Sequence, residues 1–299
     1  MSQSTLKQKI QSGTFVMTAE VTPPLSSDPN DLLQRAAPLR GIADAVNVTD
    51  GAGARAHLES TVAAHILMTN GIEPILQLTC RDRNRIALQS QLVGAAALGI
   101  TNVLALTGDD PKAGDQPDAK PVFDLDSTGL VATAATIRDK HQLPHGRAVA
   151  GSADFFVGVA DAPIDPPEGW VPASLSRKIQ AGAQFAQTQF CMDPAVMRRY
   201  LARLAEHGLL TNFHLLVGVV PLASARSARW IRDQLKGSII PEWIVERMDQ
   251  ASDPRAEGEA ICRDVLLEMR EIQGLSGAHV MAPLNEAAIP RVLASGRAR

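Results

Sequence analysis

Polar side chains recur where the short apolar runs of this sequence end. They are Glu20, Thr49, Asp50, Gln77, Thr79, Thr107, Asp109, Asp161, Thr188, Gln189 and Asn285. Amides, hydroxyls and a few carboxylates can bind a polar ligand and move a proton. No lysine ends a run, which argues against Schiff-base chemistry, and the seven histidines lack metal-ligand spacing. The pattern therefore predicts chemistry supplied by an organic cofactor.

Glu20 is the strongest candidate for an acid. It lies near the end of the apolar run 15–21, and Thr22-Pro23-Pro24 stops that run because proline cannot continue a ladder. Partial burial at such a position would favour the protonated form, as a general acid requires. An ordinary carboxylate at a strand end, paired with a neighbour, fits the same spacing, so both readings stay open.

The longest irregular segment runs from Thr107 to Asp126 and follows the apolar run 102–106. Loops of more than about 12 to 15 residues in compact proteins are usually binding loops, lids or linkers. The pair Val122-Phe123 and Leu125 offer apolar anchors, so we interpret the segment as a site loop at the carboxyl end of a strand. Asp109 has an alternative role, because Gly-Asp-Asp-Pro is also common turn chemistry.

Eight short apolar runs alternate with helical patterns along the 299 residues. The runs cover residues 15–21, 43–48, 73–79, 102–106, 154–160, 184–190, 213–220 and 278–281. Eight such alternations favour a closed (β/α)₈ barrel, as a single domain over residues 1–299 with extra C-terminal helices at 241–251 and 255–273. The residues before the first run are expected to be frayed. An open doubly wound sheet is the alternative, but it would want a glycine-rich fingerprint after the first strand.

The composition excludes several classes of protein. A net charge of -3 offers no basic field for a nucleic acid. No apolar stretch reaches the roughly 18 to 20 residues that a membrane span needs, and the polar start is not a signal peptide, so we expect a cytoplasmic protein without a membrane partner. Three cysteines without C-x-x-C spacing indicate neither a disulfide framework nor a thiolate zinc site.

Three segments, at the ends of the first, fourth and sixth runs, carry a resemblance. They read T-A-E-V-T-P-P, then L-A-L-T-G-D-D-P followed by K-P-V-F-D-L-D-S, and A-G-A-Q-F-A-Q-T-Q-F-C-M-D. In this order they resemble the methylenetetrahydrofolate reductase family, over nearly the whole chain. The resemblance implies a flavin-dependent (β/α)₈ barrel of one-carbon metabolism and methionine biosynthesis. Such an enzyme reduces 5,10-methylenetetrahydrofolate to 5-methyltetrahydrofolate with a hydride from N5 of bound FAD.

The resemblance also implies roles for individual residues. Glu20 would be the acid that assists opening of the folate ring, and Asp109 would place a negative charge beside the flavin and the pterin. Gln189, Asp109 and Asn285 would bind the folate. The implied FAD contacts are Thr49, Asp50, Gln77, Thr107, Gly108, Asp109, Asp126, Ser127, Arg177 and Lys178. Arg177 and Lys178 would meet the diphosphate, although a solvated helix face would look the same.

Departures from the family pattern leave some partners open. Thr107 stands where many relatives carry an arginine, Gln77 replaces a histidine, and residues 221–225 lack an aromatic that packs on the nicotinamide or folate in some members. NADH is therefore an uncertain electron donor, and a separate redox partner is an alternative. We expect a homo-oligomer by analogy. A flavin-free folate-dependent methyltransferase barrel and a non-catalytic partner subunit are the competing hypotheses, and the reaction direction stays open.

Overall fold

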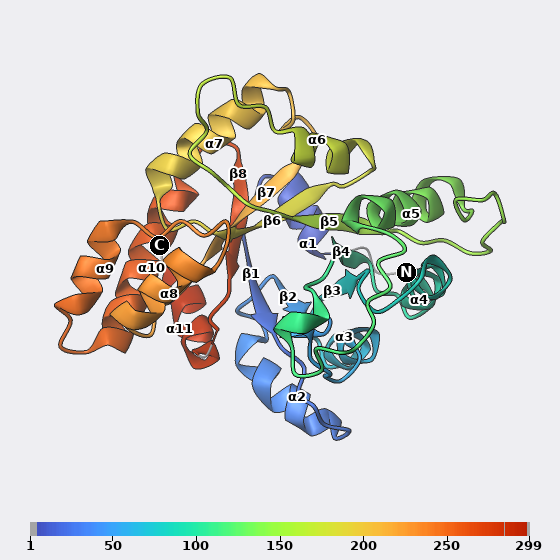
Figure 1. Cartoon of the computed structure of the whole chain (residues 1–299), viewed down its shortest axis with the longest axis horizontal. Coiled ribbons are helices and arrows are strands. Elements are labelled where there is room, and N and C mark those ends of the chain that lie inside the picture. Colours follow the sequence, from blue (N-terminus) through green and yellow to red (C-terminus); the bar gives the residue numbers. More distant parts are fainter. Residues whose placement is uncertain (1–4, 284, 298–299) are drawn as a thin grey trace.

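The computed structural model describes residues 5–283 and 285–297. Eight parallel strands close into a barrel in chain order, with β8 paired to β1 (Figure 1). The strands are β1 (Val16–Val21), β2 (Ala45–Val48), β3 (Pro74–Thr79), β4 (Asn102–Leu106), β5 (Phe156–Asp161), β6 (Phe185–Phe190), β7 (His214–Val219) and β8 (Leu275–Val280). This topology confirms the expected (β/α)₈ barrel and rules out the open sheet.

Helices surround the strands, and the late ones gather on one side of the barrel (Figure 1). The helices are α1 (Thr5–Gln11), α2 (Pro29–Ala36), α3 (Ser60–Thr69), α4 (Arg85–Ala97), α5 (Ser127–Lys140), α6 (Ala173–Gln180), α7 (Pro194–Glu206), α8 (Ala225–Gln234), α9 (Glu242–Asp249), α10 (Pro254–Arg270) and α11 (Ile289–Arg297). Short 3₁₀ turns are η1 (Ala37–Leu39), η2 (Ala52–Ala54), η3 (Pro111–Ala113) and η4 (Glu286–Ala288). The expected C-terminal helices are α9 and α10, whereas α11 was not predicted.

Residues 5–11 form a helix where a frayed segment was expected, while residues 1–4 lie outside the described residues. In α1, Leu6 is 0% exposed and Ile10 is 2% exposed, because both pack into the apolar cluster inside the barrel. The Glu73 carboxylate accepts hydrogen bonds from the backbone N–H groups of Thr5 and Leu6, each at 3.1 Å. A helix of seven residues draws its stability from such tertiary contacts, so its own sequence carries little signal.

The barrel interior changes from apolar to polar toward the carboxyl ends of the strands. Its lower part is filled by Ile75, Leu104, Phe156, Phe185 and Leu216, together with α1. Above them lie the buried polar side chains of Thr18, Asn47, Gln187 and His279. Alternate residues of a strand share a face, so residues two places further along carry their side chains to the barrel mouth: Glu20 follows Thr18, and Thr49 follows Asn47.

The expected site loop does follow β4, but its anchors differ from those predicted. Leu125 packs against the main core, whereas Val122 and Phe123 remain 44% and 38% exposed. The loop is instead fixed through its backbone, because the Val122 N–H donates to the Arg81 carbonyl at 2.7 Å. Gly108 begins the loop with a φ of 93°, a conformation that glycine adopts without strain.

Candidate functional site

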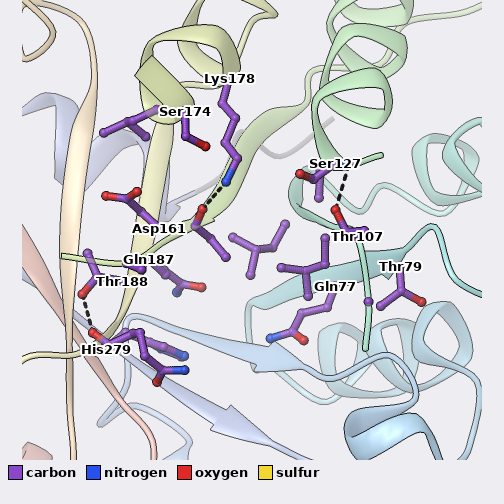
Figure 2. Close-up of a pocket in the computed structure, with 18 of the residues that line it drawn as sticks. Gln77, Thr79, Thr107, Ser127, Asp161, Ser174, Lys178, Gln187, Thr188 and His279 are labelled. Atoms are coloured by element: carbon purple, nitrogen blue, oxygen red, sulfur yellow. Dashed lines mark hydrogen bonds between the residues drawn. The ribbon is translucent and has the colours of Figure 1, made fainter. Parts of the chain in front are cut away.

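One cavity of about 840 Å³ opens at the carboxyl ends of the strands. Figure 2 shows side chains from several strands and from the starts of α5 and α6 around it. Most of the candidate residues line this cavity: Glu20, Thr49, Asp50, Gln77, Thr107, Gly108, Asp109, Ser127, Lys178 and Gln189. Residues from distant parts of the chain thus meet at the barrel face where enzymes of this fold place their sites.

Three candidates lie outside the cavity lining. Asp126 caps α5, and its carboxylate accepts the Gly129 N–H at 2.7 Å. Arg177 is exposed on α6, one residue before Lys178, which does line the cavity. Asn285 is 8% exposed, and its amide donates to the Pro221 carbonyl at 3.2 Å. Their binding roles remain predictions, and the structure gives the first and third a local structural role.

Glu20 lies within reach of two side chains from other strands. Gln77 Nε2 donates to Glu20 Oε2 at 3.1 Å, and His279 Nε2 lies 3.8 Å from the same oxygen. The Glu20 side chain is 27% exposed, whereas that of His279 is 3% exposed. Glu20 is therefore held at the boundary between the barrel interior and the cavity, where it can meet a ligand.

A buried hydrogen-bond network fixes the His279 ring. Its Nδ1 lies 2.9 Å from Thr18 Oγ1, which also accepts from Gln187 Nε2 at 3.1 Å. Gln187 and Asn47 exchange two amide hydrogen bonds of 2.6 and 3.0 Å. Since these groups are buried, the ring cannot turn without leaving polar atoms unpaired. The sequence interpretation did not single out His279, although its position on the inward face of β8 would have indicated it.

Asp50 organises the cavity wall rather than presenting a free carboxylate. It accepts from the Thr79 N–H at 2.8 Å and the Thr79 hydroxyl at 2.9 Å, and Arg83 pairs with both of its oxygens at 2.6 and 2.9 Å. Burial raises the pKa of Asp50, but the hydrogen bonds and charge of Arg83 together with Thr79 outweigh burial and hold the pKa below its usual value. The carboxylate is therefore ionised and ties β2 to β3.

Thr49 offers unused hydrogen-bonding capacity at the cavity wall, and two glycines let the backbone there pack closely on Arg81. The Thr49 hydroxyl is buried, lines the cavity and has no hydrogen-bond partner among the described residues. A Cβ atom on Gly108 would lie 3.0 Å from Arg81 Cβ, and one on Gly51 would lie 2.3 Å from Arg81 Nη2. A buried hydroxyl without a partner is costly, so it indicates a site that a bound polar group completes.

Arg81 is a cavity residue that the sequence interpretation missed. Its side chain is 4% exposed and forms a two-pronged ion pair with Asp82, with N–O distances of 2.8 and 2.7 Å. Hydrogen bonding to Asp82 raises the pKa of Arg81, and the charges of Asp50 and Asp109 add to this effect. Arg81 thus places a permanent positive charge against Gly108, at the start of the loop after β4, and close enough to Asp109 to interact with its charge.

The opposite wall holds a second group of ionisable side chains. The Lys178 ammonium donates to the Ala160 carbonyl at 2.7 Å (Figure 2), and the Tyr200 hydroxyl donates to Asp161 at 2.6 Å. Burial raises the pKa of Asp161 and lowers the pKa of Lys178. Lys178 brings a cation to the cavity beside Ser174, where an anionic group of a ligand can reach it (Figure 2).

Thiol and metal chemistry find no support in the described part of the chain. Burial raises the pKa of the Cys80 thiol to about 11 and that of Cys191 to about 12, and Cys262 is buried as well. Within residues 5–283 and 285–297, no cluster of three His, Cys, Asp or Glu side chains could hold a metal ion. Over the same residues, no helix has the length and apolar character to cross a membrane.

A (β/α)₈ barrel with a polar cavity at the carboxyl ends of its strands has the architecture of an enzyme that binds a large organic ligand. Residues 5–296 match the family model described as methylenetetrahydrofolate reductase, and the chain belongs to this family. The resemblance noted from the three motifs is thereby confirmed.

Individual relatives agree with this assignment. A 5,10-methylenetetrahydrofolate reductase of Salmonella typhimurium is 25% identical, over 78% of this chain and 72% of its own length. One from Pectobacterium carotovorum is 24% identical, over 89% and 83%. A solved structure from Clostridium thermocellum, an uncharacterized protein that binds two copies of 5-methyl-5,6,7,8-tetrahydrofolic acid, aligns with a TM-score of 0.68 over 98% of each chain. Its 13% identity supports the shared fold alone.

Proposed function

We propose that this protein interconverts 5,10-methylenetetrahydrofolate and 5-methyltetrahydrofolate as a flavin-dependent oxidoreductase. Membership of the family supports reduction of a folate one-carbon unit. The main support for a flavin-dependent reaction with Glu20 as the acid is that Glu20, Asp109 and Gln189 line one cavity. These three residues come from three separate motifs of the chain.

The cavity residues fit FAD as the cofactor. Thr49 offers a buried hydroxyl without a partner among the described residues, and Gly108 lets its loop pack closely on Thr79 and Arg81 at the cavity wall. Gln77, Ser127 and Lys178 supply an amide, a hydroxyl at a helix start and a cation for the polar parts of the molecule. In this proposal these residues would hold the flavin, whereas Arg177 and Asp126 lie outside the cavity lining.

Bound FAD supplies the redox chemistry, by donating or accepting a hydride at N5. Glu20 gives its proton to N10 of the folate as the bond from N10 to the bridging carbon opens, and takes the proton back in the oxidative direction. Gln77 holds Glu20 in place through the 3.1 Å hydrogen bond. Asp109 would hold a negative charge near the flavin and the pterin, where it would disfavour an anionic form of the reduced cofactor. Gln189 binds the pterin edge with its amide.

An absorption spectrum of the purified protein tests the proposal. We expect a flavin spectrum that bleaches anaerobically when 5-methyltetrahydrofolate is added, because reducing equivalents then pass from the methyl group to the flavin. A parallel addition of NADH decides whether a nicotinamide is the electron donor or whether a separate redox partner is required. The redox potential of whichever partner exchanges electrons with the flavin, NADH or a separate protein, then decides the reaction direction in the cell.

Two results would contradict the proposal. A colourless protein that retains no added FAD would favour a flavin-free folate-dependent methyltransferase, if it still binds 5-methyltetrahydrofolate. A colourless protein that binds no folate either would favour a non-catalytic partner subunit. Both measurements use the whole chain, so the outcomes are directly comparable.

A further inference from the structure

A tight turn at the cavity rim plays no part in the proposed chemistry. After α8, residues 235–238 form a turn that is closed by a hydrogen bond from the Ser238 N–H to the Leu235 carbonyl at 3.1 Å. Gly237, the third residue, has a φ of 85°, as a type II turn requires at that position. Lys236 is the second residue of the turn, and its side chain lines the cavity.

The turn is attached firmly to the barrel. The Ile239 N–H donates to the Phe190 carbonyl, and the Met192 N–H donates to the Ile239 carbonyl, both at 2.8 Å. Gly237 packs so closely on the loop after β5 that a Cβ atom there would lie 2.9 Å from Ala162 Cβ. The backbone that carries Lys236 is therefore fixed beside the ends of β5 and β6, which reduces the entropy that binding would cost.

Lys236 is the cavity cation without a protein partner among the described residues. Of the other two cations in the described lining, Arg81 pairs with Asp82, and Lys178 donates one hydrogen bond to the Ala160 carbonyl and is assigned to the cofactor in the proposed function. Lys236 is exposed and makes no hydrogen bond or ion pair with any described residue. An ammonium group held at a cavity mouth in this way attracts an anionic ligand group.

We propose that the turn with Lys236 forms a subsite for the carboxylates on the glutamate tail of the folate substrate. This inference rests on the proposed function. Gly237 lies next to Gln189, the proposed pterin contact, since a Cβ atom on Gly237 would lie 3.9 Å from Gln189 Cβ. The proposed flavin contacts Thr49 and Gly108 follow β2 and β4, on another part of the barrel mouth. A pterin at Gln189 with its tail directed to solvent passes this rim.

The test compares Lys236→Ala with the wild-type holoenzyme in anaerobic titrations with three probes. The probes are 5-methyltetrahydrofolate with one glutamate, the same compound with several glutamates, and a 5-methyltetrahydropterin that lacks the tail. We expect the variant to raise the Kd of the monoglutamate about fivefold at low salt, as for an exposed ion pair, and to raise that of the longer tail more. The difference should shrink at high salt, because screening weakens exposed ion pairs. Lys236→Arg should retain most of the affinity.

Lys140→Ala is the matched control, because Lys140 is exposed in the last turn of α5 and does not line the cavity. It should leave all three Kd values unchanged. Equal Kd values for Lys236→Ala and wild type, or an equal loss for the tail-free pterin, would overturn the subsite. Loss of FAD retention with intact tail dependence would assign Lys236 to a cofactor phosphate instead, and also overturn it. A wild-type protein that binds no folate would contradict the proposed function itself.

Discussion

Replacing Glu20 by glutamine removes the ionisable carboxyl group and keeps the size and shape of the side chain. Glu20 Oε2 accepts the hydrogen bond from Gln77 at 3.1 Å, and the side-chain oxygen of a glutamine can accept the same bond. The two side chains have nearly the same shape, and 27% of the Glu20 side chain is exposed, so the change creates no cavity and buries no unpaired charge. We therefore expect an unchanged fold and unchanged flavin content.

The effect on the reaction should be much larger than the effect on binding. A positioned general acid contributes roughly 100- to 10,000-fold to a rate, which corresponds to about 3 to 5 kcal/mol of activation free energy. The variant keeps the hydrogen bond from Gln77, and a single hydrogen bond from a side chain to a bound ligand contributes about 1 kcal/mol. The Kd of the folate should therefore change by no more than about fivefold, while oxidation of the reduced flavin by 5,10-methylenetetrahydrofolate slows by at least about 100-fold.

Anaerobic stopped-flow measurement of flavin absorbance separates these two quantities, since the folate dependence reports binding and the limiting rate reports the reaction. Glu246→Gln, on the exposed face of α9, is a suitable control and should react at the wild-type rate. If the reduced flavin of Glu20→Gln is oxidised by 5,10-methylenetetrahydrofolate as fast as that of wild type, Glu20 is not the acid and the proton must come from another group.

Three further outcomes are expected from single substitutions. Thr49→Val should leave the ligand-free protein as stable or about 1 kcal/mol more stable, because it removes an unpaired buried hydroxyl, while weakening FAD binding about fivefold; thermal denaturation with and without FAD checks both signs. Asp50→Asn should cost about 3 kcal/mol at pH 7 by leaving Arg83 unpaired. Because the pKa of Asp50 is lowered in the folded state, its contribution is present above about pH 4 and is lost as the pH falls through the folded pKa, so urea titrations should show the gap narrowing at low pH, and a constant gap would contradict this. Leu6→Ala should destabilise the protein by about 2 to 5 kcal/mol, whereas Leu25→Ala, at a side chain that is 78% exposed, should change little in the same urea titration.

The sequence by itself determined the barrel and the positions of most strand ends. The alternation of apolar runs and helical patterns is a local signal, and β4 begins and ends where its run does. The last strand is an exception. It begins at Leu275, three residues before the expected 278, since glycines at 274 and 277 look like a turn in the sequence, whereas Gly277 pairs with β1 and β7 in the sheet.

Only the tertiary structure decided which polar residues share the cavity. Closure of the sheet brings β8 beside β1, which places His279 against Glu20 although 259 positions separate them in the sequence. Arg81 and Lys236 reach the cavity from loops whose course depends on contacts with other loops. Asn285 turns instead to a backbone carbonyl. The direction of a side chain in a loop is set by packing against distant segments, and neither spacing nor residue type encodes that direction.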